Sequence, residues 1–335
     1  MMNDYNSYNR GVTYGSCDRT LYPLPAEKKS IRKTFSNTAW ALIVSEVFTY
    51  IFYTAFMIFL SAAGFQTYYD GDGNLIQSAP VIFLSCTSVT FGLICTSLVF
   101  GSGFHFKVSD LFGTEKVTAK KLMLTALVSL GAANAVYVIN VFISMAAYSL
   151  GFELDYAITD PVTKIDRAAE VITTVVLAPV FEEIFYRGII MRSLSRVSKY
   201  FAIFVSSAAF GLAHGNIYQF ILGFTVGIVF AYADMKMDSI LPSVIAHVAV
   251  NAHSYIYYAF SGKYEDLAYF ICVGIFIIIG TAALLYVLKH YGIDFPEYTE
   301  HHKKRCMPVL LCSVPAWLFF IYAVYSMFSS FTAVD

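Results

Sequence analysis

The sequence predicts an all-α fold, a polytopic transmembrane helical bundle of about eight to nine spans. Of its 335 residues, 58% are hydrophobic and only 13% are charged, whereas a soluble domain carries about 25% charged residues. The mean hydropathy is +0.62. The apolar residues are gathered into runs of about 20 residues, the length that a helix needs to cross the hydrocarbon core of a bilayer. Together these observations indicate a chain built for lipid.

Nine apolar stretches are candidate spanning helices. The third is long and contains Asn134 and Asn140, so we expect this helix to tilt or break. The fifth and sixth are short and are separated by little more than Gly215 and Asn216, which predicts a helical hairpin. The nine stretches, in chain order, are residues 38–63, 81–100, 122–150, 168–189, 198–214, 217–233, 239–260, 267–288 and 308–328.

The polar start of the chain is expected to lie outside the bundle. We assign residues 1–37 to a polar cytoplasmic N-terminal segment and residues 38–330 to a single transmembrane domain. The sequence contains no internal repeat that would mark a second domain. Because the first apolar run is too long for a cleaved secretory signal, we expect it to remain as a spanning helix.

The basic residues predict the orientation of the chain. Lys and Arg gather in alternate loops, beginning with residues 1–37, and the loops of membrane proteins that are rich in these residues face the cytoplasm. Only Lys164, Arg167 and Lys263 fall in the loops assigned to the other side. We therefore predict a multi-pass integral protein of the cell membrane with a cytoplasmic N-terminus. The net charge of −1 gives no overall field that would attract nucleic acid.

Three charged residues interrupt the fourth apolar stretch, in the sequence APVFEEIFYRG. Each charge within a spanning helix costs about 2.5–3.5 kcal/mol on insertion scales. Glu183 and Arg187 are four residues apart, so they can pair on one helix face, whereas Glu182 lies about 140° from Arg187 around the helix and meets a different neighbour. Pro179 lacks a backbone donor and either kinks the helix or leaves a carbonyl free nearby. A structural ion pair is one interpretation, and a functional site is the one that intramembrane acids favour.

Two further polar insertions favour the functional interpretation. Phe210 and His214 are four residues apart at the end of the fifth stretch, and His247 and Asn251 are four apart in the seventh. Residues at this spacing share one face of a helix. A carboxylate, two imidazoles and an amide provide the groups that activate water and stabilise an oxyanion.

The motifs occur in the order E-E-x-x-x-R (182–187), F-x-x-x-H (210–214) and H-x-x-x-N (247–251). This order resembles the signature of the CPBP (ABI) family of intramembrane endopeptidases, which includes the type II CAAX prenyl proteases. The resemblance covers about residues 168–254, so these residues would hold the core of the family. It implies a helical membrane enzyme whose catalytic site lies inside the membrane.

The resemblance also implies a role for each motif residue. Glu182 would act as general base, and His214 would hold the attacking water with it. His247 and Asn251 would donate to the oxygen of the tetrahedral intermediate, while the second glutamate and the arginine of the first motif would support the site. We expect the four catalytic side chains to converge on one water-accessible cavity that opens toward the cytoplasmic half.

We expect no cofactor, and a zinc ion is the alternative. Two histidines and a carboxylate, here His214, His247 and Glu182, are a sufficient ligand set for catalytic zinc. However, the sequence lacks the H-E-x-x-H motif on one helix that is typical of zinc peptidases, and the six cysteines follow no metal-type spacing. The resemblance to the prenyl-protease branch implies a glutamate-dependent, metal-free enzyme.

The predicted function is that of a glutamate-type intramembrane endopeptidase, a CAAX protease-like hydrolase. Its partners would be the lipid bilayer and a protein or peptide substrate, either lipidated or membrane-associated, and not nucleic acid. Two alternatives remain at this point. The chain could be a transporter or channel that uses the paired acids in an ion path, or an inactive family member that acts as a scaffold or immunity factor.

Other features receive structural interpretations. Gly223 and Gly227 form a G-x-x-x-G pair that predicts close helix packing. His253 points away from the helix face that carries Asn251, so we leave it out of the site. Residues 301–305, with the sequence HHKKR, would anchor the last span on the cytoplasmic side.

Overall fold

The computed structural model describes residues 25–64, 68–69, 75–76, 79–101, 108–154, 164–195, 198–256, 265–292 and 312–333. Within these ranges the prediction of an all-α fold is confirmed, because helices form the whole body and the strands form only two short two-stranded sheets. The proposed basic anchor at residues 301–305 lies outside the described residues.

Each of the nine predicted stretches coincides with helical structure. The helices are α1 (Pro25–Ala62), α2 (Ala79–Gly101), α3 (Ala119–Ser149), α4 (Lys164–Val171), α5 (Ala178–Glu183), α6 (Arg192–Ser195), α7 (Lys199–Leu212), α8 (Ile217–Met237), α9 (Leu241–Ser254), α10 (Glu265–Tyr291) and α12 (Val314–Ser329). The 3-10 helix is η3 (Val108–Phe112), and the π-helices are η4 (Ile172–Leu177) and η5 (Ile184–Met191). The antiparallel strand pairs are β1 (Tyr68–Tyr69) with β2 (Leu75–Ile76), and β3 (Phe152–Leu154) with β4 (Phe331–Ala333).

Helix length and composition identify a membrane protein. Among the described residues, four helices are long and apolar enough to cross a bilayer: α3, α8 and the greater parts of α1 and α10. Shorter apolar helices are found in α2, α7 and α12. Helix α1 begins at Pro25, so helical structure starts inside the segment that the sequence assigned to the polar N-terminal region.

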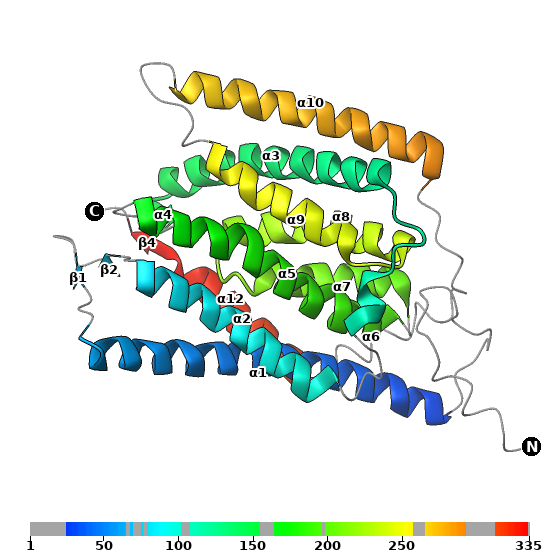
Figure 1. The fold of residues 1–335 in the computed structure, drawn as a ribbon, viewed down its shortest axis with the longest axis horizontal. Helices are drawn as coiled ribbons and strands as arrows, with labels where there is room; N and C mark the ends of the chain where they lie inside the picture. The colour runs from blue at the N-terminus through cyan, green and yellow to red at the C-terminus, as the bar shows by residue number, and fades with distance from the viewer. Residues whose placement is uncertain are drawn as a thin grey trace, which may run out of the picture.

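The helices form a layered bundle with α4 to α9 at its centre. Figure 1 shows α3 and α10 on one side of this centre, and α1, α2 and α12 on the other. The fourth predicted stretch belongs to one continuous rod, residues 164–195, which is built from α4, η4, α5, η5 and α6. This rod carries the E-E-x-x-x-R motif through the middle of the bundle.

Glycines allow the closest helix crossings. A Cβ atom added to Gly223 would lie 3.0 Å from the Cα atom of Gly211, and one added to Gly227 would lie 3.2 Å from Ser207 Cβ. The predicted α7–α8 hairpin and the close packing of the G-x-x-x-G pair are therefore confirmed. Similarly, a Cβ atom on Gly280 of α10 would lie 2.5 Å from the Cα atom of Gly131 on α3.

Helix α3 is not broken by its asparagines, because both amides find partners beside an intact helix. Asn134 Nδ2 donates to the Leu130 carbonyl at 2.8 Å and faces His253 on α9, and Asn140 Nδ2 donates to the Tyr218 carbonyl at 3.3 Å. Of the two expectations, a tilt or a break, the break is therefore wrong, since an asparagine that bonds to the preceding turn or to a neighbouring helix leaves the backbone ladder unchanged, and the tilt remains a prediction.

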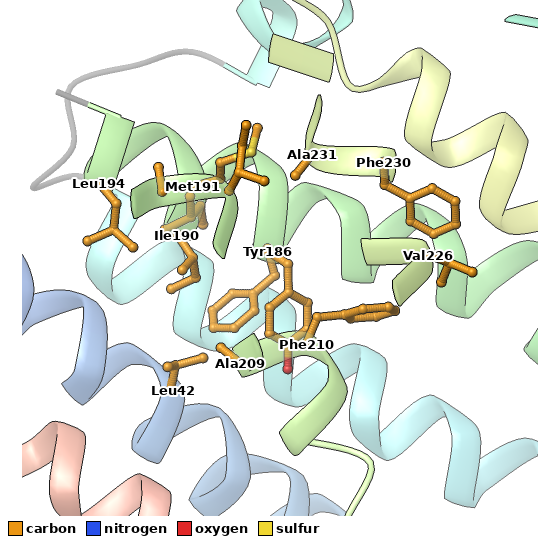
Figure 2. Packing of buried hydrophobic residues seen from close by; sticks show 14 of the residues in the cluster. Leu42, Tyr186, Ile190, Met191, Leu194, Ala209, Phe210, Val226, Phe230 and Ala231 are labelled. Carbon is orange, nitrogen blue, oxygen red and sulfur yellow. The ribbon is translucent and has the colours of Figure 1, made fainter. Parts of the chain in front are cut away.

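The buried apolar core surrounds the centre of the rod. Figure 2 shows Tyr186 and Phe210 among the rings at its middle, with Leu42 of α1 and Ile190 of η5 nearby. The Tyr186 and Phe210 ring centroids are 5.2 Å apart in an edge-to-face arrangement. The F-x-x-x-H motif therefore packs directly on the E-E-x-x-x-R motif.

Candidate active site

The rod changes its helical register next to the paired acids. In η4 the N–H of Ala178 donates to the carbonyl of Thr173, five residues earlier. The following residue in the same register is Pro179, which has no N–H to donate to Thr174. The π-helical turn and the proline thus leave one carbonyl, that of Thr174, without a partner from its own rod.

Asn251 of the neighbouring helix α9 is the hydrogen-bond partner of the Thr174 carbonyl. Its Nδ2 atom donates to the Thr174 carbonyl at 2.8 Å. The sequence-based expectation that Pro179 frees a carbonyl near the acids is therefore confirmed. Asn251 fastens α9 to the rod through this bond, and one of its two amide hydrogens is used in doing so.

Glu183 and Arg187 form the expected ion pair, fully buried. Glu183 Oε2 and Arg187 Nε are 3.1 Å apart, at an angle that does not make a hydrogen bond, and both side chains are 0% exposed. Arg187 Nη2 also donates to the Gly227 carbonyl at 3.3 Å. The guanidinium lies over the rings of Phe210 and Phe230, at 4.5 and 5.5 Å from their centroids, which is the geometry of a cation–π contact.

His247 lies between the two glutamates. Its Nδ1 atom is 2.9 Å from Glu183 Oε1, and its Nε2 atom is 3.8 Å from Glu182 Oε2. The Glu182 side chain is 16% exposed, whereas that of Glu183 is fully buried. Glu183 therefore orients the imidazole through Nδ1, and Glu182 is the more accessible acid on the other side of the ring.

His214 joins this group through Phe210. The ring of Phe210 meets the His214 ring edge-to-face at 5.1 Å and the His247 ring at 5.4 Å. His214 Nδ1 is 2.8 Å from the Phe210 carbonyl. Within the described part of the chain, no hydrogen bond or ion pair joins His214 to Glu182, so the expected shared water between them remains a prediction.

The depth of His214 follows from the length of its helix. Helix α7 has 14 residues and is therefore about 21 Å long, less than the hydrocarbon thickness of about 30 Å. The helix ends at Leu212, so His214 follows it at a level inside the bundle. A histidine at the end of a predicted span can thus still lie near residues from the middle of the rod.

Three polar residues near the site were not predicted from the sequence, and two of them are fully buried. Asp234 of α8 and Ser243 of α9 are both 0% exposed. Asp234 interacts electrostatically with Glu183 and Arg187. Glu46 of α1 lies within electrostatic range of the Tyr186 hydroxyl. Glu46 is an acid within the first apolar stretch, which is the same signal that identified Glu182, whereas Asp234 directly follows the sixth stretch, residues 217–233.

His253, which the sequence analysis left out, indeed contacts other residues. Its Nε2 atom is 2.8 Å from Asn134 Nδ2 and 3.0 Å from Asn134 Oδ1, so it joins α9 to α3. Its ring lies 4.4 Å from that of Phe276 on α10. His253 thus faces the opposite side of α9 from the acids.

The grouping of the His, Cys, Asp and Glu side chains bears on the zinc alternative. Across the described ranges, no three His, Cys, Asp or Glu side chains are grouped in a way that could hold a metal ion. His214 in particular is linked to the other motif residues through an aromatic ring rather than through a shared polar centre. Whether the protein needs a metal therefore remains a question for metal depletion.

Residues 165–253 match the family model described as type II CAAX prenyl endopeptidase Rce1-like. The matched segment contains all three motifs and runs from α4 through nearly all of α9. The family interpretation made from the motifs is confirmed. No curated protein and no solved structure matches the chain.

Proposed function

We propose that the protein is an intramembrane endopeptidase with Glu182 as its general base, because residues 165–253 match the type II CAAX prenyl endopeptidase Rce1-like family model. In this proposal His214 holds the attacking water with Glu182. His247 and Asn251 stabilise the oxyanion, and Glu183 with Arg187 supports them.

The position of His247 between two glutamates is the observation that carries the proposal. Glu183 accepts from Nδ1 at 2.9 Å, which fixes the ring and turns Nε2 toward Glu182, 3.8 Å away. A carboxylate on one imidazole nitrogen sets what the other nitrogen can do, as in catalytic triads. A glutamate and an oriented imidazole beside each other can act on a water and on a carbonyl oxygen in one step.

The reaction would proceed by addition and elimination. Glu182 takes a proton from water as the water oxygen bonds to the peptide carbonyl carbon, and the carbonyl oxygen becomes the oxyanion. His247 Nε2, protonated at this stage, and the second amide hydrogen of Asn251 donate to that oxygen. When the carbon–nitrogen bond breaks, Glu182 returns the proton to the leaving amine, so the products are a carboxylic acid and an amine.

The substrate class follows from the family. A protease of this family implies a protein substrate, and a CAAX sequence carries a prenyl group on its cysteine. We infer that the substrate is a lipidated or membrane-associated protein, presented to the centre of the bundle from the bilayer. The prenyl group would remain among apolar helices while the peptide reaches Glu182.

We also infer that the protein lies in the cell membrane with a cytoplasmic N-terminus. The basic loops support this orientation, as do the several helices that are long and apolar enough to span. Labelling of single introduced cysteines with a membrane-impermeant thiol reagent tests the orientation. Labelling of the N-terminal segment in intact cells would contradict it.

The decisive test of the proposal is Glu182→Gln. The probe is an internally quenched farnesylated peptide that ends in a CAAX sequence, together with the same peptide lacking the farnesyl group. We expect kcat to fall about 10²–10⁴-fold because glutamine cannot accept a proton from water, while the thermal unfolding of the purified protein stays unchanged. The matched control is Glu170→Gln, which changes an acid on the same rod that pairs with Arg167 and should leave kcat unchanged. Near-normal turnover by Glu182→Gln would refute the general-base assignment.

Removal of metal tests the zinc alternative. Activity should survive chelation that elemental analysis verifies, because a glutamate base needs no metal. A catalytic zinc would instead be held by three protein ligands with an open fourth position. Activity that is lost on depletion and restored by stoichiometric zinc would replace our mechanism with a metal-dependent one.

A further inference from the structure

Helix α9, which carries His247 and Asn251, begins without a cap of its own. The residue at its N-cap position is Ile240, whose side chain makes no capping hydrogen bond, and Pro242 follows in the first turn. The first N–H groups of a helix have no partner within the helix and need an acceptor from elsewhere. Isoleucine cannot provide this acceptor, whereas Ser, Thr, Asp and Asn can.

The acceptor comes from the preceding helix. Asp234 of α8 accepts from the N–H of Ser243 through Oδ1 at 2.9 Å. The Ser239 hydroxyl accepts from the N–H of Leu241 at 3.2 Å. Asp238, in a left-handed conformation with φ of 52°, turns the chain tightly enough to bring α9 back against α8. Asp234 thus caps α9, although it precedes Ser243 by nine residues and belongs to α8.

The carboxylate of Asp234 is costly where it lies. Its side chain is 0% exposed, and among the described residues its Oδ2 atom has no hydrogen-bond partner. A buried polar group without a full set of partners is destabilising. An apolar residue would pack there at lower cost, so the cap is the gain that this side chain provides.

The capped residue leads directly to the proposed active site. Ser243 is one turn before His247 on the same face of α9, and its hydroxyl donates to the Ile240 carbonyl at 2.9 Å. Further along, Asn251 is fastened to Thr174 at 2.8 Å. Asp234 therefore fixes the first turn of α9, and Asn251 fixes a point two turns beyond it, with His247 between them.

We propose that Asp234 is a positioning residue for the peptidase reaction: its carboxylate caps α9 from α8 and thereby sets the place of His247 against Glu182 and Glu183. The proposal rests on the proposed function, because it concerns the residues assigned to the oxyanion. What matters is an acceptor atom at the place of Oδ1, and the negative charge is secondary.

Two substitutions separate the position of the acceptor from its charge. Asp234→Asn keeps an oxygen at the place of Oδ1 and removes the charge, whereas Asp234→Glu keeps the charge and displaces the oxygen by one methylene. We expect Asp234→Asn to retain kcat within about 3-fold of the wild type. We expect Asp234→Glu to lose about 10²-fold in kcat with little change in KM, since a misplacement of about 1 Å costs a factor of this size. If the glutamate variant does not purify in a folded form, Asp234→Ala takes its place with the same expected loss.

A second measurement reads the position of α9 without catalysis. Hydrogen exchange of the purified protein, followed by mass spectrometry, should show faster exchange across Leu241–Ser254 in Asp234→Glu or Asp234→Ala, and wild-type exchange in Asp234→Asn. If the wild type proves to have no peptidase activity, the proposed function fails while this exchange pattern still supports the cap. Equal kcat and equal exchange in all variants, or an asparagine variant as impaired as the glutamate variant, would overturn the positioning role.

Discussion

The α3–α10 contact and the contact between the rod and α9 hold helices together in opposite ways. Between α3 and α10, Gly131 and Gly280 let two backbones touch, and the outer face of α10 is apolar and exposed, as at Ile278 with 70% exposure. Between the rod and α9 the contact is made by an imidazole on the buried Glu183 and an amide on the Thr174 carbonyl, beside the buried ion pair that lies within the rod. The first contact is sterically close and has its charged group, Lys120, at an exposed place, whereas the second is polar and buried.

The difference shows where this chain accepts the cost of charge in an apolar environment. Lipid gives helices no hydrophobic drive to associate, so close packing and hydrogen bonds must supply it. Glycine contacts bring α10 against α3 without a buried ion pair, since Lys120 of α3 and Tyr286 of α10 meet at an exposed place. Charges at the rod are therefore not needed for assembly as such, which favours a functional reason for placing them there.

The largest expected effect is that of breaking the buried ion pair. Arg187→Met keeps a long apolar side chain but leaves Glu183 buried without its cation, which should lower the free energy of unfolding by about 3–5 kcal/mol. Unfolding in mixed detergent micelles measures this loss. The control Arg167→Met removes an arginine that is 29% exposed and should cost at most about 1 kcal/mol.

A double variant sharpens this prediction. Glu183→Gln together with Arg187→Met removes both charges, so it should be less destabilised than Arg187→Met alone. Strictly additive losses would mean that the two side chains do not depend on each other, and the buried pair would then not be the reason for the instability.

A smaller loss is expected on the glycine side of the comparison. Gly280→Val places a side chain where a Cβ atom would lie 2.5 Å from the Cα atom of Gly131, so α3 and α10 must separate. Overpacking of this kind costs about 1–3 kcal/mol. Gly274→Val is the control on the same helix, because a Cβ atom there meets nothing within 4 Å. The kcat of the folded Gly280→Val protein should stay near that of the wild type; a large loss of kcat would place α10 in the reaction.

The smallest effect belongs to the polar contact between α3 and α9. Asn134→Leu removes the partner of His253, and interhelical hydrogen bonds in membranes contribute about 0.6 kcal/mol on average. We expect a loss of about that size, and a smaller one when His253→Phe is already present. A loss as large as that of Arg187→Met would show that this contact stabilises the fold as much as the buried ion pair does.

The helices were predictable because the bilayer imposes a length on them. About 20 apolar residues must follow one another to cross it, and this is visible in one sequence. The expectation that the asparagines break α3 was wrong because the sequence does not show which residue a polar side chain contacts. Asn134 contacts His253, which is 119 positions away. Apolar runs in the sequence predict the spanning helices, whereas the partners of polar groups depend on how the helices pack.

The motif residues of the site were also predictable, but their contacts were only partly so. The pair Glu183–Arg187 follows from helical spacing. The place of His247 between both glutamates does not, because it depends on the register of α9 against the rod. Asp234 directly follows the sixth apolar stretch, and its role as a cap depends on the α8–α9 turn, which the sequence does not show. The cavity that we expect at the four catalytic side chains remains a prediction.

Phe210 links the three motifs by contact. It is 2% exposed, and its ring meets Tyr186 and Arg187 of the first motif, His214 of its own motif and His247 of the third. A substitution that changed the size of this one ring would therefore disturb all three motifs together. The three motifs are thus mechanically one unit, and the position of each depends on the size of a ring that carries no charge and no hydrogen-bonding group.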